Sequence, residues 1–208
     1  MIRAGDTIEN PVTGERVTFL RTSAQTGGEF VLIDTTVAPN GFVAAEHLHP
    51  YQSERFEILE GEVEFKVGGE LVTAGAGDVV VVEPGTAHRF RNAGEGEVRF
   101  RCEVRPALNF ETFLVTMFGL AADGKTGKKG LPNPFRLAVI MAEHFDLVRL
   151  PSVPAWVQRT GLAGGEVARL RAHVPLPDGA GAAGPGRLGR SADGDTPATG
   201  VALRWPGQ

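Results

Sequence analysis

A chain of 208 residues is long enough for one domain with a sizeable hydrophobic core and some appendages. Its formal net charge of −4 at pH 7 gives no electrostatic reason to expect nucleic acid as a partner. The single cysteine, Cys102, excludes disulfide bonds within the chain and is typical of a reducing compartment.

The first residues, Met1 to Asp6, contain charges but no apolar run after them, so we expect no signal peptide. The sequence also contains no stretch near the roughly 20 apolar residues that cross a bilayer. We therefore expect a cytoplasmic protein without a membrane span.

Residues 13–105 read as short strands separated by turns. Turn signals rich in Gly, Pro and Asn recur at intervals of about 8 to 12 residues or slightly more. The runs between them, such as Val63–Val67 and Val79–Val82, alternate or are β-branched. This rhythm predicts an all-β sandwich or barrel, which we assign to a domain over residues 1–106.

After the predicted barrel, the spacing of the apolar residues becomes that of a helix. Asn109 is a candidate N-cap, and the apolar residues after it recur at the spacing of one helix face over about three turns. They are Phe110, Phe113, Leu114, Met117, Phe118 and Ala121. We expect this stripe to pack on the barrel or across a dimer interface.

Two further helices are expected in an extension over residues 107–174. Asn133 followed by Pro134 predicts the start of a helix that runs to about Phe145. A weaker helix is expected from about Pro154 to His173, where several glycines disfavour it. Residues 175–208 contain 13 Gly and Pro among 34 residues, so we expect a disordered tail there.

Three histidines and one glutamate form the most informative pattern. His47 and His49 stand two apart before a turn, so on a strand they point to the same face with backbones about 7 Å apart. Glu54 begins the next strand, and His88 follows a later turn. Three imidazoles and a carboxylate suit one divalent transition metal, such as Fe, Mn, Ni, Cu, Co or Zn, better than Ca or Mg.

These residues carry a resemblance to the cupin superfamily. The first cupin motif is matched at every defined position, by Gly41, His47, His49, Glu54 and Gly61. The second is matched by Gly77, Asp78, Gly85, His88 and Asn92. Glu83 and Pro84 depart from the family pattern, which usually has proline two residues before the glycine of the second motif. The short spacing between the motifs is similar to that of small microbial cupins.

The resemblance implies a single jelly-roll β-barrel, followed here by C-terminal helices, with His47, His49, Glu54 and His88 as metal ligands. It also implies that a homodimer is common. The alternative is a metal-free barrel in which these polar residues hydrogen-bond to one another. By strand parity, Phe56, Phe90 and Cys102 share the inward face and either line a substrate pocket or simply fill the barrel core.

Function is expected to follow from the metal. Four protein ligands leave about two coordination positions open for a small molecule. A dioxygenase-type oxidoreductase acting on a phenolic or diketone-like molecule is the leading hypothesis, by analogy with other cupins. The alternatives are a metal-dependent isomerase or cyclase, and a barrel that binds a small ligand without turnover.

Overall fold

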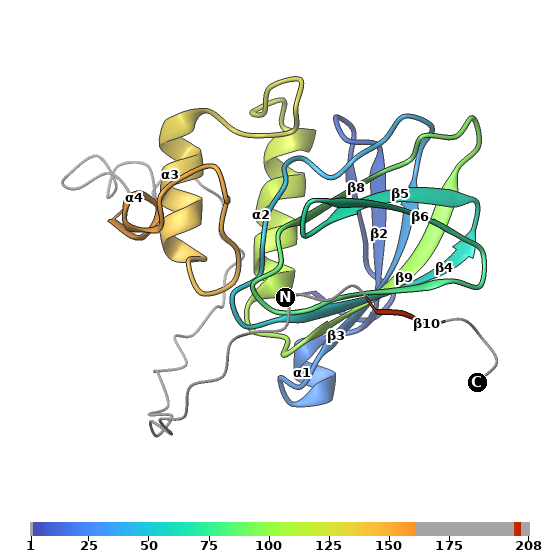
Figure 1. The fold of residues 1–208 in the computed structure, drawn as a ribbon. Coiled ribbons are helices and arrows are strands. Elements are labelled where there is room, and N and C mark those ends of the chain that lie inside the picture. The colour runs from blue at the N-terminus through green and yellow to red at the C-terminus, as the bar shows by residue number, and fades with distance from the viewer. Residues whose placement is uncertain (1, 161–201, 205–208) are drawn as a thin grey trace.

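The structure is a computed structural model, and it describes residues 2–160 and 202–204. Two antiparallel sheets face each other and form a jelly-roll barrel (Figure 1), which confirms the predicted fold class. The larger sheet has the strand order β1-β2-β3-β9-β4-β7-β10 and the smaller one β6-β5-β8. The strands are β1 (Thr7–Asn10), β2 (Glu15–Arg21), β3 (Val31–Val37), β4 (Ser53–Glu60), β5 (Glu62–Val67), β6 (Glu70–Gly75), β7 (Val79–Val82), β8 (His88–Arg91), β9 (Val98–Arg105) and β10 (Ala202–Arg204).

Alternation along each strand explains which residues fill the barrel. In β9, Phe100, Cys102 and Val104 are buried, whereas Arg99 and Arg101, which alternate with the buried residues, are exposed. This is the period of two expected of a strand with one face in the core and one in water.

Aromatic side chains from both sheets meet in the middle of the barrel. Phe56 packs against Phe65 with ring centroids 5.1 Å apart, and Phe90 packs against Phe100 at 5.2 Å. The tilted and edge-to-face arrangements are those that aromatic pairs favour. This core fixes the strands on which the polar site is built.

The segment between β3 and β4, two strands of the larger sheet, pairs with β8 of the smaller sheet and carries two of the histidines. A β-bridge joins His47 to His88 at the start of β8. Gly41 opens the segment in a tight space, because a Cβ there would lie 2.6 Å from Val37 Cγ1 and 2.8 Å from the Thr13 carbonyl oxygen. The glycine of the first motif is therefore needed for close backbone approach.

Four helices accompany the barrel within residues 2–160. A short helix that the sequence analysis did not predict, α1 (Ser23–Thr26), follows β2. Helix α2 (Phe110–Ala122) lies between the barrel and α3 (Pro134–Glu143), as Figure 1 shows. Helix α4 (Ala155–Thr160) is the last.

The ends of the helices differ in detail from those predicted. Asn109 precedes α2, but its side chain makes no capping hydrogen bond and instead lies 2.9 Å from His144 Nδ1. Asn133 does cap α3, accepting from the Arg136 amide, although α3 ends at Glu143 and not at Phe145. The third helix covers Ala155–Thr160, and the rest of its predicted range lies outside the described residues.

The predicted disordered tail also lies mostly outside the described residues. Within it, the structure describes Ala202–Arg204, which form β10 and pair antiparallel with β7. Among the described residues, the helices are too short or too polar to cross a membrane.

Candidate metal centre

The barrel brings His47, His49, Glu54 and His88 together. One nitrogen or oxygen atom of each lies within 4.8 Å of the others. His47 and His88 are held by paired backbone hydrogen bonds of 3.0 and 2.7 Å, and Glu54 projects from β4 of the opposite sheet. The convergence that the sequence spacing predicted is therefore present.

Each imidazole is oriented by a backbone carbonyl. Nδ1 lies 2.8 Å from the Ala45 oxygen in His47, 2.7 Å from the Leu147 oxygen in His49 and 3.0 Å from the Thr86 oxygen in His88. A carbonyl only accepts, so each Nδ1 must carry the proton and each neutral ring presents the lone pair of Nε2. This second layer of hydrogen bonds is typical of metal-binding histidines.

Buried atoms without hydrogen-bond partners mark the centre of the cluster. His49 Nε2 is buried and unpartnered, and so is Glu54 Oε2. Glu54 Oε2 lies only 2.6 Å from His88 Nε2, but the arrangement does not satisfy hydrogen-bond geometry. A proton on His88 or a metal ion between the two atoms would make this contact favourable, and the nitrogen and carboxylate donors fit a divalent transition ion.

The electrostatics favour the metal-binding protonation states of Glu54 and His47. Burial lowers the pKa of His88, but the Glu54 carboxylate outweighs burial and raises that pKa. Burial raises the pKa of Glu54, but the neighbouring histidines outweigh it and lower the pKa to about 2. Burial and the charge of His88 lower the pKa of His47 to about 3. Near neutral pH, Glu54 is thus an anion and His47 a neutral imidazole, which are the forms that ligate metals.

A largely apolar cavity opens from this cluster. Its volume is about 120 Å³. Phe56, Phe90 and Cys102, which the sequence placed on the inward face, all line it. They are also buried in the hydrophobic core. These three residues therefore fill the barrel core and form part of the cavity wall at the same time. Burial raises the pKa of Cys102 well above its usual value, which keeps the thiol protonated and unreactive.

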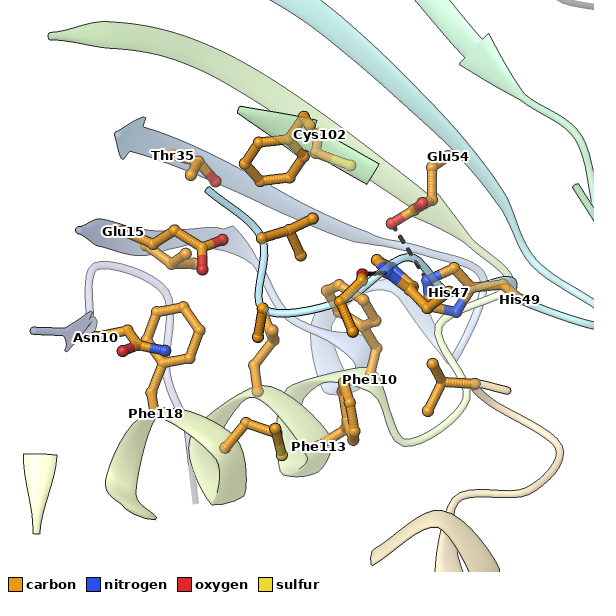
Figure 2. A pocket seen from close by; sticks show the side chains of 18 of the residues that line it. Asn10, Glu15, Thr35, His47, His49, Glu54, Cys102, Phe110, Phe113 and Phe118 are labelled. Carbon is orange, nitrogen blue, oxygen red and sulfur yellow. Dashed lines mark hydrogen bonds and ion pairs between the residues drawn. The ribbon is translucent and has the colours of Figure 1, made fainter. Parts of the chain in front are cut away.

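Helix α2 forms the opposite wall. Its apolar stripe lines the cavity through Phe110, Phe113, Leu114, Met117 and Phe118. Leu137 and Met141 of α3 add to the lining. The stripe was expected to pack on the barrel or across a dimer, and in the structure it faces the barrel across the cavity (Figure 2).

Three polar lining residues, Asn10, Glu15 and Thr35, were not identified from the sequence. They lie on β1, β2 and β3, where Asn10 pairs with Glu15 and Glu15 pairs with Val37, two residues after Thr35. The available signal was strand parity. Glu15 is two and four residues before Val17 and Phe19, and Thr35 lies midway between Ile33 and Val37, so each shares the face of its apolar neighbours.

Part of the barrel is similar to known proteins. Residues 33–104 match the family model of the cupin domain. Over 62 residues the chain is 34% identical to polyketide synthase CurC of Streptomyces cyaneus, a match that covers 30% of this chain and 40% of the relative. The chain thus matches less than half the length of that curated relative.

Two of the solved structures that are similar to this chain match about half of its length. A predicted oxalate decarboxylase of Thermotoga maritima is 23% identical, with 51% of this chain and 98% of that chain covered and a TM-score of 0.45. Pac13 of Streptomyces, a nucleoside dehydratase, is 21% identical, with 52% and 81% covered and a TM-score of 0.42.

Proposed function

Because residues 33–104 of this chain belong to the cupin family, we propose that the protein is a metal-dependent enzyme acting on a small phenolic or diketone-like molecule. The reaction we favour is a dioxygenase-type oxidation. The observation that carries the proposal is the meeting of an N3O donor set with the wall of an apolar cavity.

The chain's own residues would divide the work. His47, His49, Glu54 and His88 would hold one divalent transition ion, with the imidazoles kept in place by their Nδ1 hydrogen bonds. When bound, such an ion supplies Lewis acidity and, if redox-active, access to O₂ chemistry. The aromatic walls from β4, β8 and α2 would bind a flat apolar ring and exclude water from it.

A redox-neutral reaction, such as a cyclisation or isomerisation, is the second candidate. The similarity to a protein named polyketide synthase CurC favours it, because polyketide chains carry β-diketone units that a Lewis acid can activate. Both candidates place the same oxygen-bearing substrate class at the same ligands. They differ in whether O₂ is consumed.

The test combines elemental analysis with oxygen uptake. Protein purified without chelator should contain about one transition ion per chain and consume O₂ with a member of a panel of catechols, flavonols and β-diketones. His49→Ala and Glu54→Gln should lose the metal and the activity. Glu57→Gln, on the same strand but paired with Arg55 outside the cluster, should retain both.

The outcomes separate the candidates. Conversion of a β-diketone without O₂ uptake would favour the redox-neutral reaction. Tight binding of these compounds without turnover would point to a binding protein. A wild-type protein that neither contains nor takes up a transition ion would refute the proposal.

A further inference from the structure

The cavity has a second polar end. Figure 2 shows Asn10, Glu15 and Thr35 gathered at one end of the cavity, with His47, His49 and Glu54 at the other. The wall between them is apolar and includes Phe110, Phe113 and Phe118. Polar groups at both ends of an apolar cavity are the usual arrangement for fixing the orientation of a small molecule.

Thr35 provides the strongest sign that this end binds something. The residue is 2% exposed, and its Oγ1 has no hydrogen-bond partner among the described residues. Leaving a buried hydroxyl unpaired has a free-energy cost, so such groups normally have a partner. Valine would fill the same space on β3 without that cost, yet the position carries a hydroxyl that lines the cavity.

Glu15 and Asn10 add complementary groups on the neighbouring strands. One carboxylate oxygen of Glu15 accepts from Thr13 Oγ1 at 2.8 Å, and the side chain reaches into the cavity (Figure 2). Burial raises the pKa of Glu15 to about 7, so near neutral pH the carboxyl exists in both forms and can donate or accept. Asn10 Oδ1 accepts from the amides of Val12 and Thr13, which leaves its amino group as the donor toward the cavity.

We infer that Glu15 and Thr35, with Asn10 beside them, form a subsite that binds a hydroxyl group at the end of the ligand remote from the metal ligands. The inference rests on the proposed function for the identity of the cavity as the ligand site. It deepens the substrate class: an elongated aromatic molecule with a metal-binding oxygen at one end and a phenolic or enolic hydroxyl at the other.

Non-chelating probes test the subsite separately from the metal. We would titrate the full chain, freed of metal by a chelator, with 2-naphthol and with 2-methylnaphthalene, and obtain dissociation constants from ring fluorescence. The two probes have nearly the same shape and differ in the hydroxyl. The expected preference for 2-naphthol is about tenfold, the effect of one to two well-formed hydrogen bonds.

Variants assign that preference to residues. Thr35→Val and Glu15→Leu should each reduce the preference to less than about threefold, while affinity for 2-methylnaphthalene stays the same or rises. Thr36→Val, the next residue of β3 and on its opposite face, should keep the full preference. Thr35→Val removes an unpartnered hydroxyl, so it should fold at least as well as the natural protein.

Equal affinity for the two probes in the natural protein would overturn the inference. So would a preference that survives both Thr35→Val and Glu15→Leu, or binding of neither probe. These failures are distinct from failure of the proposed function, which would appear as an absent metal or absent turnover. Conversely, His49→Ala should abolish metal binding and leave the preference for 2-naphthol intact.

Discussion

Glu15 makes the stability of the protein depend on pH. Burial raises its pKa from 4.5 to about 7, with the Thr13 hydrogen bond offsetting part of the shift. The folded state binds this proton more tightly than the unfolded state. The contribution of Glu15 to stability is therefore fully present below pH 4.5 and is lost as the pH rises through 7. The shift corresponds to a loss of up to about 3 kcal/mol.

Glu15→Gln should therefore stabilise the protein, and more so at higher pH. Urea unfolding should show a small gain at pH 5 that grows to as much as about 3 kcal/mol at pH 8. The other titratable groups of the cavity, which are His47, His49, Glu54, His88 and Cys102, are present in both proteins and largely cancel in the difference. Glu9→Gln, on an exposed residue, is the control and should give no trend. A gain independent of pH would contradict the assignment.

At this scale the sequence predicted the metal-ligand candidates but not what orients them. His47, His49, Glu54 and His88 stand at informative spacings, so their convergence could be predicted. The carbonyl that orients His49 belongs to Leu147, which is 98 residues away. A carbonyl exists at every position, so no residue type in the sequence marks this partner.

Helix α2 contains a glycine that its packing does not require. Gly119 lies in the interior of the helix on its exposed side, and a Cβ there would meet nothing within 4 Å. Gly119→Ala should raise the free energy of unfolding by about 1 kcal/mol, the difference in helix propensity between the two residues. Denaturant unfolding measures this, and ligand binding should stay unchanged because the opposite face lines the cavity.

Gly124 is the matched control for that substitution. It follows the end of α2 with φ of +66°, a conformation that L-residues adopt with strain. Gly124→Ala should therefore destabilise the protein. Equal effects at the two glycines would show that backbone conformation does not decide the outcome.

The helical period predicted the extent of α2 and the existence of its apolar face. It could not show whether that face met the barrel or a second chain, because periodicity identifies a buried face and not its partner. The extent of α3 was overestimated at its C-terminal end. Helix ends are set by local capping. The C-cap residue of α3 is His144, and it is not a glycine, which is the residue type that marks a helix end in a sequence.

The strand rhythm and the two motifs were sufficient to predict the jelly-roll barrel at the scale of the whole molecule. They could not predict that residues after α3 would return to the site. Leu48 and Arg149 exchange two backbone hydrogen bonds of 2.9 Å, which join the histidine segment to the chain after α3. The homodimer and the cytoplasmic location stay predictions.

This connection couples the candidate metal site to the C-terminal part of the described structure. The His49 ring hydrogen-bonds to the Leu147 carbonyl through Nδ1 and presents Nε2 to the other candidate metal ligands. A metal ion whose free concentration is 100 times its dissociation constant should stabilise the fold by about 2.7 kcal/mol. Chelation should then lower the melting temperature by about 5 to 10 °C for a chain of this size.

Chelation should also loosen a specific part of the molecule. Amide hydrogen exchange at Leu48 and Arg149 should accelerate more than at Ile33, which lies in the middle of β3 and is paired on both sides, by β2 and β9. His49→Ala should show the same pattern without chelator. Uniform acceleration across all three amides would mean that the ion stabilises the barrel as a whole and that the Leu147 carbonyl does not transmit its effect.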